Sequence, residues 1–525
     1  MRPVRATAVL VVTALAMGCG GGGFPGTPDL PGTGDPGRLE IPADGEAGDG
    51  EPRPDRPPPD PTADAVREAD AAADPETGDD GYPDGPRGSG DDATTVEPGT
   101  EAVETPDPDA GGDPPDDLPN DGAAADTGPE VPLPDVPPVD AGILVNAIRE
   151  GDQSQPSVAP RKGGGWWVAW QTRAPSGGDW QVAARCLAPD GTPASEEVRV
   201  SSEDCLAARR PSVAVTDDGS LWVAYEADGL DGDGSAVALR RLASCDADAG
   251  PEWRLNAFTS SFQGAPALAP LPGGTVVAAW QSECRVSSSC AWLDGSWAAV
   301  AHRRANDDGP IGLGESVVNR FTVGDQFQPS VAAMPGGGWW VAWAGATDVS
   351  SIYDVFLDRF DADGLRQGED LPVNGSVAGP QSMPRICALA GGGAAVAWMD
   401  WDPAGTAMDL RARLLDPSGR PRSADLPLAA DPEGLESSVA LAPAGDGFRA
   451  AWRHRRSSSS PGTVRWRVFD ADGNPSGPER IASEDRDGDS GQPALATAAD
   501  GRAFLVFTSS AGDGSGTAIV AVPLP

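Results

Sequence analysis

The chain contains two histidines, His302 and His454, and neither has partners that would complete a catalytic set. His302 precedes Arg303 and Arg304, and His454 lies within an Arg-His-Arg-Arg run in a different part of the chain. A Ser-His-Asp set, an HExxH zinc motif or a metal–histidine cluster needs several such residues at defined spacing. From these two histidines we therefore expect neither a catalytic residue nor a bound cofactor.

Two acid-rich segments carry alternating carboxylates, which can bind Ca²⁺. Their six residues are Asp228, Asp231, Asp233, Asp485, Asp487 and Asp489. An EF-hand loop has Gly at its sixth position and Glu at its twelfth, where the second segment has Ser490 and Ala496. We favour solvated turns and keep Ca²⁺ binding as the alternative.

The cysteine pattern indicates an oxidising compartment. Cys284 and Cys290 flank a five-residue segment and are predicted to form a disulfide. Four further cysteines can pair in three ways, between which the sequence does not choose. These are Cys186, Cys205, Cys245 and Cys387. No pair has the CxxC spacing of a zinc site.

A Gly-Asp-Gln-x-Gln-Pro motif occurs at 151–156 and again at 324–329. Its candidate ligand-binding residues are Asp152, Gln153, Asp325 and Gln326. Asp and Gln side chains in a loop can equally well hydrogen-bond exposed backbone amides. We favour that structural role and keep ligand binding as the alternative.

These motifs belong to a repeat that occupies most of the chain. An apolar run after a proline recurs at Pro156, Pro211, Pro266, Pro329, Pro384 and Pro493. In a seventh copy, Ser437 is placed in the proline position, so that successive copies lie 53 to 63 residues apart. A repeat of this length, built from short strands, is typical of propeller blades.

Each copy predicts four strands. The first follows the proline, as in Pro329–Ala332, and a Gly-rich turn leads to an aromatic, β-branched second strand such as Trp339–Trp343. The third strand alternates basic and apolar residues, as in Leu410–Leu415, and the fourth ends near a Val-Asn pair such as Val373-Asn374. The fold class is therefore all-β, with a seven-bladed propeller over 141–525.

Two features of the repeat predict how the propeller is held together. The second strand always ends in an aromatic residue, which we expect to pack between blades. Only three strands fit after Pro493, whereas Gly142–Ala147 is a spare strand before the first copy. We predict that this N-terminal strand completes the last blade and closes the ring.

The N-terminus carries an export signal at residues 1–18. Arg2 and Arg5 precede the apolar run Ala6–Ala16, which is too short to span a bilayer as a mature helix. Ala16-Met17-Gly18-Cys19 resembles the bacterial lipoprotein signal. This resemblance implies cleavage before Cys19 and a lipid on its side chain and amine. Gly20 after the cysteine, by resemblance to sorted lipoproteins, favours the outer membrane of a bacterial cell envelope.

Residues 19–140 form a predicted disordered linker rich in Pro, Gly and Asp. Segment 20–140 holds 32 acidic residues against five arginines, within a chain of net charge −42. Self-repulsion extends such a segment, which suits a spacer between membrane and propeller. Its negative charge argues against binding nucleic acid.

The repeat itself resembles the propeller-type repeats of large exported bacterial surface proteins. That resemblance implies a fold and an exported setting, and it carries no catalytic residues. Sialidases also use propellers, but Thr216–Trp222 falls one residue short of their SxDxGxTW box. The leading prediction is a monomeric, non-enzymatic binding or scaffold module for a protein or glycan. The alternative is an extracellular glycan-acting hydrolase or lyase.

Overall fold

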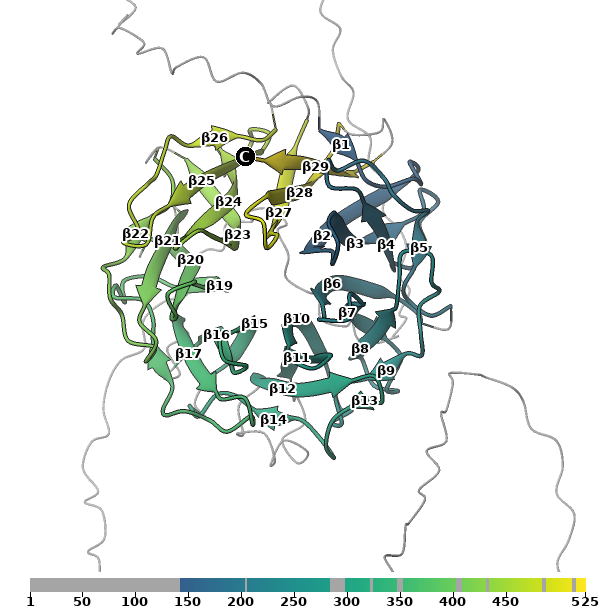
Figure 1. Cartoon of the computed structure of the whole chain (residues 1–525), viewed down its shortest axis with the longest axis horizontal. Helices are drawn as coiled ribbons and strands as arrows, with labels where there is room; N and C mark the ends of the chain where they lie inside the picture. The colour runs from purple at the N-terminus through teal and green to yellow at the C-terminus, as the bar shows by residue number, and fades with distance from the viewer. Residues whose placement is uncertain are drawn as a thin grey trace, which may run out of the picture. The chain divides into compact units, whose positions relative to one another are not determined.

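The computed structural model describes residues 142–525, apart from residue 204 and segments 284–297, 322–323, 347–352, 403–407, 431–433, 484–487 and 512–515. Its strands form seven antiparallel sheets, arranged as blades around a central axis (Figure 1). The prediction of an all-β, seven-bladed propeller is therefore confirmed. No helix among the described residues is long and apolar enough to cross a membrane.

Each blade runs from an innermost strand to a short strand at the rim (Figure 1). Blade 1 contains β2 (Asp152–Pro160), β3 (Trp166–Arg173), β4 (Gln181–Leu187) and β5 (Val198–Arg199). Blade 2 contains β6 (Ala208–Val215), β7 (Leu221–Asp228), β8 (Ser235–Leu242) and β9 (Trp253–Arg254). Blade 3 contains β10 (Gln263–Leu271), β11 (Thr275–Glu283), β12 (Ala298–Asn306), β13 (Gly309–Pro310) and β14 (Ser316–Val317). Blade 4 contains β15 (Gln326–Ala333), β16 (Trp339–Gly345), β17 (Asp354–Phe360) and β18 (Leu371–Pro372).

The remaining blades close the ring. Blade 5 contains β19 (Gln381–Ala388), β20 (Ala394–Trp401), β21 (Met408–Leu415) and β22 (Leu426–Pro427). Blade 6 contains β23 (Leu435–Ala444), β24 (Gly447–Arg455), β25 (Thr463–Phe469) and β26 (Arg480–Ile481). Blade 7 contains β27 (Ser490–Thr497), β28 (Ala503–Ser509), β29 (Ala518–Leu524) and, as its outermost strand, the N-terminal β1 (Ile143–Leu144). Since Ile143 and Leu144 pair with Ala521 and Val520, the predicted closure is confirmed.

The innermost strands begin three or four residues before the recurring proline, earlier than predicted. Each of them contains a β-bulge, and the residue before the proline has a positive φ, such as 53° at Gln328. The bulge interrupts the hydrogen-bonded ladder, so the strand can continue through a proline, which has no N–H.

The bulge also corrects the alignment of blade 6. There the positive φ falls at Ser438, and the register breaks between Ser437 and Ala440. Val439, and not Ser437, therefore occupies the proline position. The placement of Ser437 was wrong because that copy has no proline to mark the bulge.

Side chains from neighbouring blades form the core. Each second strand runs two or three residues beyond the aromatic residue that was predicted to end it. These aromatic residues are all buried, as predicted: Trp170, Tyr225, Trp280, Trp343, Trp398, Trp452 and Phe507. Trp166 and Trp167 in β3 belong to two different apolar clusters, one shared with blade 7 and one with blade 2. A strand between two blades buries both of its faces, which accounts for the consecutive tryptophans.

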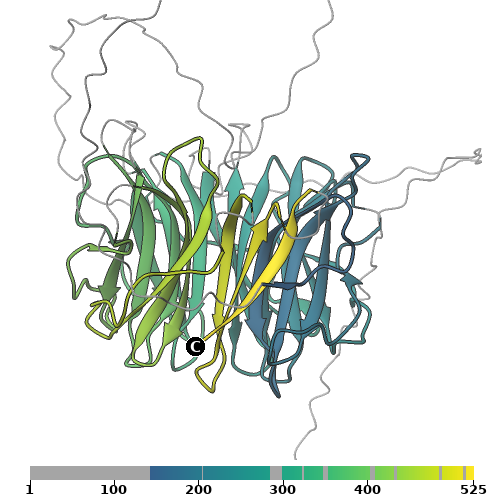
Figure 2. The same cartoon turned by 90° about the horizontal axis from the view of Figure 1, so that it is seen from above.

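One face of the propeller brings together the beginnings of the innermost strands and the ends of the second strands, because these strands are antiparallel. The loops that lead into the innermost strands lie on the same face. We call it the upper face; it lies opposite the end of the ring that holds the C-terminus in Figure 2.

Candidate functional site

The Val-Asn pair and the Gln of the repeat form a buried hydrogen-bond network. Asn374 Nδ2 donates to Gln381 Oε1 at 3.0 Å and to the Ser376 carbonyl at 2.6 Å, and Asn374 Oδ1 accepts the Val355 N–H at 2.7 Å. The same Asn–Gln contact joins Asn146 to Gln153 and Asn256 to Gln263. The network fixes the loops that lead into the innermost strands.

The candidate ligand residues of the Gly-Asp-Gln motif take part in this framework. Gln153 and Gln326 are fully buried, and Gln326 bonds to the Trp343 indole N–H at 2.9 Å and the Ala346 carbonyl at 2.8 Å. Asp152 forms an ion pair with Arg173 at 2.7 Å, and Asp325 is half-buried. Their binding of a ligand stays a prediction.

A second polar framework, which sequence reasoning missed, joins neighbouring blades at the rim. A carboxylate just before an outermost strand accepts backbone N–H groups from the preceding blade's loop, as Asp425 does from Gly375 at 2.8 Å and Ser376 at 3.0 Å. A third-strand arginine reaches back in the same direction, as Arg413 does to the Val373 carbonyl at 2.7 Å. The sequence contained a signal for this framework, because an acidic residue and an arginine recur at fixed positions of the repeat.

At the axis, the seven bulge residues with positive φ form what we call the bulge ring. It consists of Gln155, Arg210, Ala265, Gln328, Met383, Ser438 and Gln492. Side chains link the ring from blade to blade: Gln492 Oε1 accepts the Gln155 N–H at 3.0 Å, and Gln328 Oε1 accepts the Met383 N–H at 2.9 Å. Gln492 is exposed although it lies on an innermost strand, so water reaches the axis here.

Blade 2 introduces charge into this ring. Arg210 Nη1 lies 2.7 Å from Glu226 Oε1, and the same oxygen accepts the Ala265 N–H at 2.6 Å. Glu226 replaces the neutral Gln171 and Gln281, whose side chains accept the corresponding N–H groups of Arg210 and Gln328. Blade 2 thus places an arginine–carboxylate pair where its neighbours have neutral amides.

Blade 6 departs from the repeat more strongly. Glu436 takes the place of the buried Gln, and its Oε1 lies 2.9 Å from His454 Nδ1, with both side chains buried. His454 Nε2 has no hydrogen-bond partner among the described residues. Next to it, Arg453 binds both carboxylate oxygens of Asp489, at 2.6 and 2.7 Å. An imidazole oriented through one nitrogen, with the other nitrogen unpartnered, has the arrangement of a general acid or base.

The other histidine belongs to the core. His302 in β12 packs against Phe360, with ring centroids 4.4 Å apart, and against Trp339. Burial, together with Arg366 and Arg304, lowers the pKa of His302 to about 4. It is therefore neutral at physiological pH.

The predicted Ca²⁺ residues are spread among separate contacts. Asp228 pairs with Arg209 at 3.0 Å, Asp231 accepts the Asn256 amide at 2.9 Å, and Asp233 accepts the Ser261 N–H at 3.1 Å. No group of three or more acids, His or Cys that could hold a metal ion occurs in the part of the chain that the structure describes. Asp485 and Asp487 lie outside the described residues, and Ca²⁺ binding stays a prediction.

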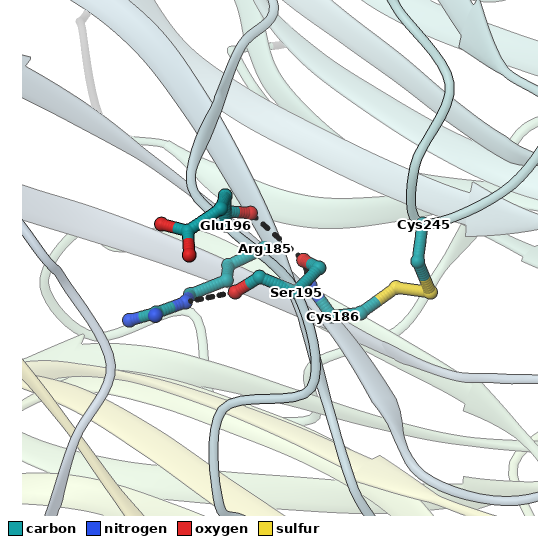
Figure 3. Close-up of a disulfide and its surroundings, with 5 residues drawn as sticks. All are labelled: Arg185, Cys186, Ser195, Glu196 and Cys245. Carbon is teal, nitrogen blue, oxygen red and sulfur yellow. Dashed lines mark hydrogen bonds between the residues drawn. A yellow bond between two sulfur atoms is a disulfide. The ribbon is translucent and has the colours of Figure 1, made fainter.

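One disulfide, Cys186–Cys245, ties blade 1 to blade 2 (Figure 3). It is one of the pairings that the sequence left open. Beside it, Ser195 Oγ accepts the Cys186 N–H at 3.1 Å and Arg185 donates to the Ser195 carbonyl at 2.8 Å. Cys387 is a buried thiol, and burial raises its pKa to about 12. Cys284 and Cys290 lie outside the described residues.

No protein-family model and no curated protein sequence matches the chain. Solved structures do resemble its fold. An ulvan lyase, described as a new family of polysaccharide lyase, is 12% identical with a TM-score of 0.50, covering 72% of this chain and 96% of that one. A protein of unknown function from Dyadobacter fermentans is 12% identical (TM-score 0.46; 74% and 99% covered). A Hadza microbial sialidase is 14% identical (TM-score 0.42; 68% and 76% covered). At this identity, the likeness shows the fold alone.

The comparisons correct the leading prediction of function. The ulvan lyase, whose TM-score is 0.50, is by its description an enzyme that acts on a glycan. The prediction of a non-enzymatic binding or scaffold module is therefore wrong, and the alternative is favoured. The sequence misled because its repeated residues are the structural ones, and they conceal the few that depart from the repeat.

Proposed function

We propose that this protein is a glycan-acting enzyme, a hydrolase or a lyase, whose substrate binds at the bulge ring on the upper face. The observation that carries the proposal is the chemistry of that ring. Gln155, Gln328 and Gln492 place amides at the axis, and Arg210 adds a guanidinium. Amides offer both donors and acceptors to sugar hydroxyls, and a guanidinium offers donors in a fixed plane.

Cleavage of a glycosidic bond also requires proton transfer, by hydrolysis or by elimination. The His454–Glu436 pair at the upper end of blade 6 is suited to this step, because Glu436 orients the ring through Nδ1 and leaves the buried Nε2 without a hydrogen-bond partner among the described residues. We propose His454 as the proton-transferring group and Glu436 as its positioning residue. The likeness to ulvan lyase supports the proposal, since a protein described as a polysaccharide lyase has a fold similar to this one.

Activity on a panel of polysaccharides tests the proposal. The full chain is incubated with neutral and acidic polysaccharides, and new reducing ends are measured. Ultraviolet absorbance of an unsaturated uronate product separates elimination from hydrolysis. We expect cleavage of at least one polysaccharide, with a loss of about 100-fold or more in His454→Gln.

Arg502→Gln serves as the matched control, because Arg502 pairs with Asp500 in a turn on the opposite face. Its activity should equal that of the unaltered chain. A folded protein that releases no ends from any polysaccharide, or a fully active His454→Gln variant, contradicts the proposal.

We further propose that the enzyme is exported and anchored through a lipid on Cys19, with the acidic segment as its spacer. The lipoprotein-type signal and the composition of residues 19–140 support this. Cys19→Ser should move the protein from the detergent phase to the aqueous phase in a partition experiment. Unchanged partitioning would exclude the anchor.

A further inference from the structure

Blade 5 carries an arginine at a position where every other blade has a small neutral residue. Arg385 follows Pro384 in β19 and pairs with Ala397 of β20. The residues at the same register in the other blades are Ser157, Ser212, Ala267, Ser330, Ala440 and Ala494. The serines at this position are uncharged. One of them, Ser330, accepts the Ile386 N–H of the next blade's innermost strand through its Oγ at 3.2 Å. Side chains at this position therefore lie beside the axis.

Arg385 is accessible to water on an innermost strand. Its side chain is exposed, although Pro384 and Ile386 on either side are buried and the strand is the innermost of its blade. The surrounding protein partly desolvates the guanidinium and so lowers the pKa of Arg385.

Among the described residues, no carboxylate neutralises the charge of Arg385. Its Nη1 donates to the Pro384 carbonyl at 2.9 Å, and no carboxylate of the described residues lies within ion-pair distance. Arg210 and Arg453, by contrast, are paired with Glu226 and Asp489. A lone guanidinium in a partly enclosed space attracts anions more strongly than one in open water, because the lower dielectric screens it less.

We propose that Arg385 is an anion-binding residue of the channel, and that the glycan bound at the bulge ring carries a carboxylate or sulfate group held by its guanidinium. Met383 of the ring precedes Arg385 by two residues, so the arginine lies just inside the ring. A guanidinium matches both anions because it donates two parallel N–H groups to two oxygens. The part of the inference that concerns the glycan rests on the proposed function, whereas the anion site does not.

Calorimetric titration of the full chain tests the inference. The probes are an acidic oligosaccharide with uronate groups, one with sulfate groups, and a neutral oligosaccharide of the same length. Arg385→Gln should weaken binding of at least one acidic probe by about 10- to 100-fold, the range expected for a hydrogen bond to a charged group. Arg385→Lys should recover part of the loss, and Arg502→Gln should change nothing. Whichever acidic probe loses more identifies the anion.

The outcomes separate this inference from the proposed function. Binding that depends on Arg385 without any cleavage supports the anion site and contradicts the enzyme. Cleavage whose preference for acidic substrates survives in Arg385→Gln supports the enzyme and overturns the anion site. If Arg385→Gln does not fold, competition between sodium sulfate and the acidic oligosaccharide on the unaltered chain decides: no competition overturns the inference.

Discussion

Asn374 illustrates what the repeated polar residues do. Its amide makes four hydrogen bonds at a buried site: it donates to Gln381, to Asp354 and to the Ser376 carbonyl, and it accepts the Val355 N–H. The Asn–Gln contact recurs at Asn146 and Asn256, where it likewise holds the loop that enters an innermost strand. At the residue scale, repetition therefore marks structure. Function is to be sought where the repeat is broken, as at Arg210, Arg385 and His454.

Asn374→Ala should destabilise the fold by about 2–3 kcal/mol, because it leaves buried groups of Gln381 and Val355 without partners. Urea denaturation followed by tryptophan fluorescence measures this loss. Asn474→Ala, at an exposed turn residue, is the control and should cost less than about 0.5 kcal/mol. If the two variants lost equal amounts of unfolding free energy, the Asn–Gln network would contribute no more to stability than an exposed turn residue does.

From the protonation of Asp358 we predict that the free energy of unfolding depends on pH. It replaces the third-strand arginine in blade 4, and Arg366 from the following loop pairs with it at 2.6 Å and reaches the Val317 carbonyl. Burial outweighs the attraction of Arg366 and raises the pKa of Asp358 from 3.8 to about 6. The folded state thus binds a proton that the unfolded state releases between these values, so this residue's contribution to stability falls as pH rises from about 4 to about 6.

Asp358→Asn should remove that decline. The free energy of unfolding is measured by urea denaturation at several pH values, and the variant is compared with the unaltered chain at each one. The difference, unaltered minus variant, should fall as pH rises through this range. A difference that is constant or that rises with pH contradicts the assigned pKa.

At the scale of elements, the bulge decides how the innermost strand is built. The sequence predicted four strands in each blade and their order, because turn glycines and alternating apolar residues mark them locally, but it did not predict the fifth, short strand of blade 3. It placed the start of the innermost strand too late, since a proline ordinarily ends pairing. It also missed the bulge ring, because a positive φ at Gln328 or Met383 has no signature in the residue itself.

Ala265 and Ala267 lie on either side of Pro266 in β10. Comparing them measures the backbone strain that the positive φ causes at the bulge. Ala265 has φ 48°, a conformation that costs a residue with Cβ about 1–2 kcal/mol, whereas Ala267 is not among the residues with positive φ. Ala265→Gly should therefore stabilise the fold by up to about 1 kcal/mol, and Ala267→Gly should destabilise it by about 0.5–1 kcal/mol. Thermal unfolding measures both. Destabilisation of equal size in both variants would refute the strained bulge.

At the scale of the whole molecule, the ring is closed by its N-terminal strand. Val145 N–H donates to the Ile519 carbonyl at 2.9 Å, and Asn146 Oδ1 accepts the Ile519 N–H at 2.9 Å, so the closure uses an Asn as blades 2, 3 and 4 do. The sequence predicted this from counting strands. It could not predict the channel site, because Arg385 gains its meaning only from the six neutral positions around the axis.

Removal of residues 1–147 should lower the unfolding temperature of the propeller, because it leaves β29 unpaired on one edge and exposes Ile519. Removal of residues 1–141 retains β1 and provides the control, which should unfold at the temperature of the full chain. Differential scanning calorimetry compares the three proteins. Identical temperatures for both truncations would contradict closure by β1.

The central claim is that a glycan binds and is cleaved at the bulge ring on the upper face. Hydrogen exchange of the full chain, with and without an oligosaccharide of the cleaved polysaccharide, locates the ligand directly. We predict slower exchange in peptides from the beginnings of the innermost strands, including those with Gln155 and Met383. Protection confined to the rim, around the Cys186–Cys245 disulfide or the outermost strands, would contradict the account.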